Sequence, residues 1–150
     1  MTATYLSESA FHGNIDVVKA ALEAGAKVNG PPQQPCPPTA TATITNRVGM
    51  VDFLLDQGAD PNKPVTIDFT AAKPGEHALH VAARTGKVEI VRLLLKQSRV
   101  DPAATDYARR TPLMATCESS RDVEIVQLLL KAGADPPMAR LDGYISLCTR

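Results

Sequence analysis

The sequence predicts an all-α solenoid of about four helix-turn-helix repeats plus a truncated fifth, with the turns between repeats projecting on one side. Two observations predict this fold. One apolar nine-residue pattern occurs four times, at residues 14–22, 47–55, 87–95 and 122–130. Gly25 and Gly58, which follow the first two copies, stand 33 positions apart. A fixed period between about 20 and 50 residues is the sequence signature of stacked repeats.

Each copy of the pattern predicts a long helix with apolar residues on several sides. In the third copy, Val88, Val91 and Leu95 recur at helical spacing, while Ile90 and Leu93 fall elsewhere on the circumference. Such a helix must be covered from two sides, and stacked neighbours provide that cover. A glycine follows three of the four copies and can close the helix in the left-handed conformation.

A shorter helix is expected before each long one. In the fourth repeat it opens with Thr111 as a cap and Pro112 at the first helical position, where the missing N–H is not needed. The third repeat has an alanine-rich version at residues 77–83, whose small side chains allow close packing. A turn precedes each of these helices, at residues 106–109 and, less clearly, at residues 72–75.

These segments resemble the ankyrin repeat. The resemblance rests on Ala-Leu-His-Val-Ala-Ala-Arg-Thr-Gly at residues 78–86 and the long-helix pattern that follows it. Thr111-Pro-Leu and the recurring Leu-Leu-x-x-Gly-Ala-Asp-Pro support it further. It implies two antiparallel helices per repeat, and a concave face made of the turn tips and the short helices. It also implies a binding role, and it gives His80 the task of hydrogen bonding between repeats.

The resemblance covers nearly the whole chain, so residues 1–150 are expected to form a single domain. The spacings divide it into repeats at roughly 1–30, 31–71, 72–105, 106–138 and a partial 139–150, with an insertion around 63–75. No long helix follows to cover Leu147. The fifth repeat is therefore a truncated cap, the start of a longer natural chain, or an edge that pairs with another chain.

Two tips depart from the family pattern. Residues 30–38 are rich in proline and predict a stiff, polyproline-like turn, which is either a tolerated decay of the motif or a rigid tip that grips a partner. Arg109 stands where the family has a turn glycine, so a backbone with positive φ would carry a steric cost and the turn is free to adopt another type. With Tyr107 and Arg110 it forms either a solvated basic turn or a partner anchor.

The composition narrows the possible partners and surroundings. Sixteen basic residues balance sixteen acidic ones and aromatic residues make up only 4%, so nucleic acid is not an expected partner. No apolar run is long enough for a membrane helix. The widely spaced Cys36, Cys117 and Cys148 predict free thiols in a reducing compartment, the cytoplasm or the nucleus.

No motif predicts an enzyme, a metal site or a cofactor. His77 and His80 share a helix, but that helix offers no nearby carboxylate or thiolate in the same element, which makes a poor metal site. The expected function is that of a scaffold or adaptor that binds another protein through the concave face. The alternative is a protein that binds or converts a small molecule in the same groove, with His12 as the first acid-base candidate.

The repeat register places a set of side chains on the tips and on the exposed ends of the short helices, where they are expected to bind the partner. They are Phe11, His12, Cys36, Ile44, Thr45, Lys73, Glu76, Arg84, Thr85, Tyr107, Arg109, Arg110, Glu118, Leu141 and Tyr144. This row runs from apolar to charged, so the expected partner segment has an apolar end and an acidic stretch. The chain is expected to be a monomer or to self-associate weakly through its C-terminal edge.

Overall fold

A computed structural model describes residues 2–67 and 72–134, and these residues form eight α-helices. The helices are α1 (Thr2–His12), α2 (Ile15–Glu23), α3 (Pro38–Ile44), α4 (Val48–Asp56), α5 (Ala78–Arg84), α6 (Val88–Leu95), α7 (Pro112–Glu118) and α8 (Val123–Lys131). Within the described part of the chain, none of them has the length and apolar character needed to cross a membrane. Leu141 and Tyr144, which the sequence placed in the binding face, lie outside the described residues.

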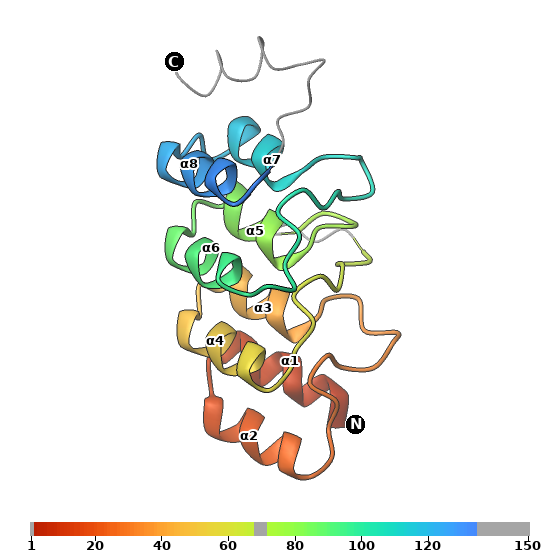
Figure 1. Ribbon diagram of the computed structural model, residues 1–150. Helices are drawn as coiled ribbons and strands as arrows, with labels where there is room; N and C mark the ends of the chain where they lie inside the picture. Colours follow the sequence, from red (N-terminus) through yellow and green to blue (C-terminus); the bar gives the residue numbers. More distant parts are fainter. Residues whose placement is uncertain (1, 68–71, 135–150) are drawn as a thin grey trace.

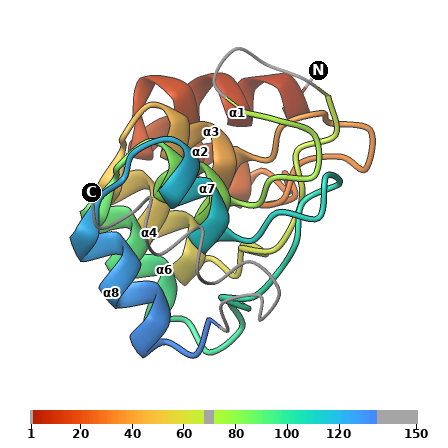
Figure 2. The same cartoon turned by 90° about the horizontal axis from the view of Figure 1, so that it is seen from above.

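The helices form hairpins that stack on one another in chain order (Figure 1). The inner row consists of α1, α3, α5 and α7, with each helix packed on the next, and the outer row consists of α2, α4, α6 and α8. Seen from above, the connecting segments extend together to one side, away from α4, α6 and α8 (Figure 2). This arrangement confirms the expected all-α repeat fold with its tips on one side.

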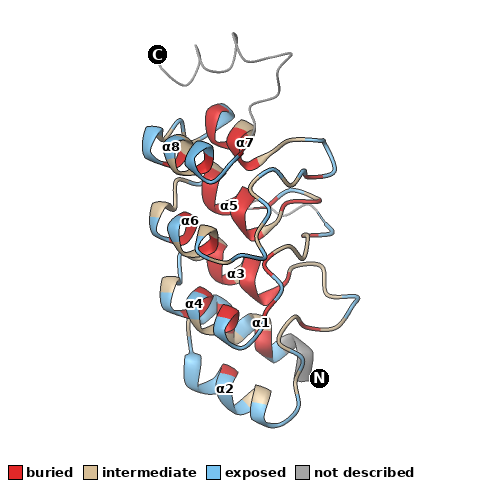
Figure 3. Ribbon diagram, in the orientation of Figure 1, coloured by how far each residue is buried: buried red, intermediate tan, exposed pale blue. Residues whose placement is uncertain are grey.

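The core runs along the stack between the two rows. Leu54, Leu94 and Leu129, at equivalent positions of three outer helices, are each fully buried. Leu6 of α1 and Leu79 of α5 fill the same core from the inner row. The inner helices α3 and α5 are buried on nearly every side (Figure 3). Each hairpin therefore depends on its neighbours for most of its cover.

The helix ends follow the local chemistry of the sequence. Thr111 Oγ1 accepts a hydrogen bond from Met114 N at 3.3 Å, which confirms Thr111 as the cap of α7. Gly25, Gly58 and Gly133 all have φ between 84° and 96°. They confirm the expected left-handed closure of three long helices.

The first hairpin differs from the expectation of a short helix before each long one. Helix α1 has 11 residues and α2 has 9. Helices α3 and α7 begin at Pro38 and Pro112, because a proline fits the first turn of a helix and not its interior.

Helix α3 forms despite its run of threonines. Thr41, Thr43 and Thr45 each donate a hydroxyl hydrogen bond to the backbone carbonyl four residues earlier, at 2.8 to 3.1 Å. The hydroxyl groups are therefore satisfied by the preceding turn of the same helix, so they can be buried against the neighbouring repeats. The weak propensity of the segment is overridden by its position in the stack.

The cysteines differ from the expected set of free thiols. Cys36 is free, whereas Cys117, buried in α7, is disulfide-bonded. The prediction of free thiols is therefore wrong for Cys117. The cysteines therefore no longer support the expectation of a reducing compartment.

Truncation of Leu94 tests the role of the stacked core. Leu94→Ala removes a fully buried side chain at the centre of the stack and should cost about 2 to 5 kcal/mol of unfolding free energy. Leu130→Ala, on the last described helix, should cost much less because Leu130 is 42% exposed. Urea denaturation of the two variants measures both losses, and equal losses would contradict a covered centre with an exposed end.

Candidate partner-binding face

The last turns of the inner helices place one side chain per repeat in a continuous row. Phe11, Ile44, Arg84 and Glu118 occupy equivalent positions of α1, α3, α5 and α7, and each of these helices packs on the next. Phe11 is 50% exposed, Ile44 and Arg84 are partly buried, and Glu118 is exposed. The row begins with two apolar residues and ends with two charged ones.

A second row follows directly at the helix ends. His12, Thr45 and Thr85 occupy equivalent positions at the ends of α1, α3 and α5, and His12 and Thr85 are exposed. The His12 ring packs edge-on against Phe11, with 5.2 Å between the ring centroids. Thr85 and Thr45 donate their hydroxyl groups to carbonyls of their own helices. The structure thus brings these sequence-predicted residues together on one side of the inner row.

Three further members of the predicted set are exposed on the tips, and one is partly buried. Lys73 is exposed on the tip before α5, and Tyr107 and Arg109 are exposed on the tip before α7. Tyr107 is 65% exposed, which is the largest exposed fraction among the large hydrophobic side chains of the described residues. Cys36 is partly buried beside α3, and burial raises the pKa of its thiol although a hydrogen bond from Thr41 opposes the shift.

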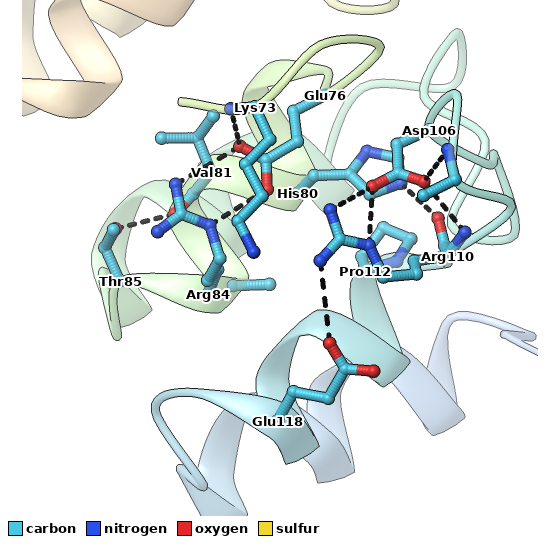
Figure 4. A network of polar contacts seen from close by, with 12 residues as sticks. Lys73, Glu76, His80, Val81, Arg84, Thr85, Asp106, Arg110, Pro112 and Glu118 are labelled. Carbon is cyan, nitrogen blue, oxygen red and sulfur yellow. Dashed lines mark hydrogen bonds and ion pairs between the residues drawn. The ribbon is translucent and has the colours of Figure 1, made fainter. Parts of the chain in front are cut away.

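Glu76 does not belong to the exposed face. Its side chain is fully buried, and its Oε1 accepts a hydrogen bond from Arg84 Nε at 2.9 Å (Figure 4). Its Oε2 accepts one from Lys73 N, also at 2.9 Å. The prediction of an exposed Glu76 is therefore wrong. A buried carboxylate needs a charged partner and full hydrogen bonding: Arg84 of α5 supplies the charge, and Arg84 and the Lys73 N–H supply the hydrogen bonds.

A second buried carboxylate, Asp106, organises the tip before α7. It accepts backbone hydrogen bonds from Ala108 and Arg110 at 2.9 Å, and two more from the Arg110 guanidinium at 2.9 and 2.6 Å (Figure 4). Burial alone would raise the pKa of the Asp106 carboxyl, but the bonds from Arg110 outweigh it and hold that pKa below its ordinary value. Arg110 also reaches Glu118, at 3.6 Å. The tip is therefore fixed by its own charges.

Arg109 keeps the backbone conformation that a glycine would adopt. Its φ is 60°, in the left-handed region, and its N–H donates to the Asp106 carbonyl at 3.0 Å. The turn therefore retains its geometry and carries the strain of a non-glycine residue, instead of changing type. The four bonds to the Asp106 carboxylate make this strain tolerable.

His80 joins two repeats through its ring. Nδ1 accepts a hydrogen bond from His77 N at 3.2 Å, so the proton of the neutral ring lies on Nε2, which donates to the Arg110 carbonyl at 2.9 Å. This bond confirms the inter-repeat role that the family resemblance implied. Burial lowers the pKa of His80, although the bond to the Arg110 carbonyl opposes the shift, and the ring is held neutral.

Neighbouring tips are locked together through their backbones. Gly75 has a φ of 83°, and a Cβ at this position would lie 2.2 Å from Tyr107 N and 2.5 Å from the Tyr107 ring. Gly75 N also donates to the Val65 carbonyl at 2.7 Å, and Thr66 N donates to the Pro35 carbonyl at 2.8 Å. The tips therefore form one connected wall beside the inner helices.

Comparison with known proteins agrees with this geometry. The family model for ankyrin repeats, three copies in length, matches residues 63–139. The putative ankyrin repeat protein YahD of Escherichia coli (strain K12) is 30% identical in an alignment that covers 98% of this chain and 88% of the relative. The chain belongs to the ankyrin-repeat family. Ankyrin repeats generally mediate protein–protein interaction.

Two other relatives contain ankyrin-like segments within much longer chains. Alpha-latrocrustotoxin-Lt1a of Latrodectus tredecimguttatus is 30% identical over 81% of this chain and 8% of its own length. Alpha-latroinsectotoxin-Lt1a of the same species is 34% identical over 65% of this chain and 6% of its own length. This ankyrin stack therefore spans less than a tenth of either relative, and the likeness concerns the repeats alone.

Sequence reasoning missed the ion pairs that hold the ankyrin tips. Arg84 and Arg110 were predicted as binding residues, but Glu76 and Asp106 neutralise them within the chain. The signal for one pair was present, since Asp106 and Arg110 stand four positions apart on either side of the turn. The described residues contain no cluster of three His, Cys, Asp or Glu side chains that could hold a metal ion.

Replacing Gly75 tests the contact between tips. Gly75→Ala combines a strained positive φ with a clash against the Tyr107 backbone, so it should lower the unfolding free energy by more than the roughly 1 kcal/mol expected from φ alone. Gly25→Ala is the matched control, because its φ is 96° and nothing lies within 4 Å of the added Cβ. Equal losses in the two variants would show that the tips do not pack as described.

The pKa of His80 predicts how stability depends on pH. Because burial lowers this pKa in the folded state, the unfolded chain binds the proton more readily below the ordinary value of 6.5. Stability should therefore be fully present above that value and should fall as the pH decreases from 7 to 5. His77, whose pKa is also lowered by burial, acts in the same direction.

Urea denaturation at pH 7 and pH 5 measures the effect. His80→Gln removes the titrating group while keeping one donor and one acceptor, so it should reduce the loss of stability between the two pH values. His12→Gln, at an exposed ring, is the control variant. A wild-type chain that gains stability on acidification over this range would contradict the neutral, buried state of His80.

Proposed function

We propose that this ankyrin stack is a scaffold or adaptor that holds a segment of another protein along the ends of the inner helices and the tips. The observation that carries the proposal is the tip before α7, where an exposed tyrosine and an exposed arginine stand on a backbone fixed by Asp106. Tyrosine and arginine are enriched among the residues that dominate interface energies. Fixing them in advance reduces the ordering cost of binding.

The distribution of charge indicates which side chains can contact the partner. The charges of Arg84 and Arg110 are neutralised by buried carboxylates, so these residues support the tips and offer little to an acidic partner. Lys73 and Arg109 are exposed and have no ion-pair partner among the described residues. Acidic residues of the partner are therefore expected near Lys73 and Arg109.

The other end of the face favours apolar contacts. Phe11 is half exposed, and Ile44 is partly exposed in the neighbouring repeat. Together with His12 and Thr45, which follow them at the helix ends, they suit an apolar side chain of the partner. The proposed ligand is a protein segment with an apolar anchor over α1 and α3 and a carboxylate near the tip before α7.

Single substitutions separate binding from folding at this face. Tyr107→Ala should weaken partner affinity by about 2 kcal/mol or more if the ring is an anchor. Arg109→Gly is more informative, because it removes the guanidinium while relieving the strain of the positive φ, so it should weaken binding and leave stability unchanged or raised. Lys96→Ala, at an exposed position of the outer row, is the control and should bind as the wild type does.

The measurement is affinity capture from the source cell, followed by calorimetric titration of the captured partner with each purified variant. Recovery of the same partner with unchanged affinity by a chain lacking both Tyr107 and Arg109 side chains would refute this site. Substrate turnover by the purified chain, with no partner captured, would instead favour the small-molecule alternative.

A further inference from the structure

The outer helices carry a row of four charged residues on the side that is turned away from the core. In α4, Val51 and Leu54 are buried, and Asp56 projects from the opposite side of the helix. Exposed charged residues occupy the same position at the C-terminal end of each outer helix. They form the charged row, which in stack order is Glu23, Asp56, Lys96 and Lys131. The sign of the charge therefore changes once, between α4 and α6.

The acidic half of the charged row is unfavourable for its own helices. The last turn of a helix carries the negative end of the helix dipole and favours cations. Lys96 and Lys131 agree with this preference, whereas Glu23 and Asp56 oppose it. Within the described residues, no salt bridge includes any of these four side chains. Cations from another molecule would therefore stabilise the acidic half.

A second pair of charges, one helical turn earlier, repeats the change of sign. Asp52 of α4 and Arg92 of α6 are both exposed, four positions before the charged row. Phe53 and Leu93 are partly exposed, three positions before the same row. The outer surface of α4 is thus acidic and that of α6 is basic, each beside an apolar side chain.

We propose that this outer face binds a second copy of the chain, with the two stacks antiparallel. A twofold axis parallel to the helices, midway between α4 and α6, places α4 of each copy against α6 of the other. Asp56 then faces Lys96 of the second copy, and the symmetry supplies the same pair again. Glu23 faces Lys131 of the second copy in the same way. The chain is complementary to itself on this face.

The charges select this arrangement over other pairings of the same face. Two stacks that run in the same direction would bring Asp56 against Asp56 and Lys96 against Lys96, which is repulsive. The first turns of the outer helices carry Asp16, Glu89 and Glu124, so the contact is centred on the last turns, away from this acidic end. An interface built on a few exposed ion pairs predicts a weak dimer that salt dissociates.

Charge reversal tests the dimer. Asp56→Lys and Lys96→Asp each set like charges against one another at both symmetric contacts, so each variant should dimerise about tenfold more weakly or not at all. Lys73→Asp is the control, because it changes the net charge as Lys96→Asp does but lies on a tip, on the other side of the stack (Figure 2). Sedimentation velocity on the full chain at low salt, from micromolar to millimolar concentration, measures dimerisation, and circular dichroism confirms that each variant is folded. Wild type and the control should dimerise with rising concentration.

Mixing the two reversed variants separates a specific contact from a general loss of association. The mixed pair has opposite charges at both contacts, so an equimolar mixture should dimerise although neither variant does so alone. A chain that carries both Asp56→Lys and Lys96→Asp should dimerise with itself but not with wild type. Raising the ionic strength to about 1 M, where the Debye length is about 3 Å, should dissociate all of these dimers.

Three results would overturn the proposal. A wild-type chain that stays monomeric up to millimolar concentration at low salt leaves this face without a second copy. Dimerisation of either single variant at wild-type strength places the contact elsewhere, and a mixture that stays monomeric excludes the antiparallel pairing. Lys73→Asp should weaken binding of the captured partner and leave the dimer unchanged, so failure of this inference and failure of the proposed function are distinguishable.

Discussion

The long helices of the described stack are apolar on more than one side, and their apolar surface leaves water where neighbouring hairpins cover it. This requirement explains the stack, because neighbouring hairpins of the described chain cover one another. It also explains why the equivalent positions of Met50, Ile90 and Ile125 are buried. The fold follows from the same requirement.

The tips have no core of their own, so other interactions must hold these connecting segments in place. Two buried carboxylates do this by satisfying backbone N–H groups and a neighbouring guanidinium at the same time: Glu76 with Arg84, and Asp106 with Arg110. His80 then links the second of these tips to α5 through the Arg110 carbonyl. The tips are consequently part of the stack, and the side chains that they expose are held in fixed positions.

The repeats could be predicted from the sequence because they depend on periodicity and on helix-end chemistry, both of which are local. Thr111 caps α7 and Gly25 closes α2 in the left-handed conformation, as their residue types indicate. The site was predicted less well, because exposure at a tip depends on contacts between segments. Glu76 was assigned to the surface since nothing in its neighbourhood reveals that Arg84, eight residues later, turns back to it. Arg109 was an open question for the same reason, because only the bonds around Asp106 decide that the left-handed backbone is kept.

Buried charges fix the tips of the free chain. Hydrogen exchange at the backbone amides of Ala108 and Arg110, which donate to the Asp106 carboxylate in the free chain, tests this role most directly. Slow exchange is expected at both amides, with the protection lost in Asp106→Asn while the amides of α6 stay protected. Exchange of both amides at the rate of an unfolded peptide in the wild-type chain would contradict it.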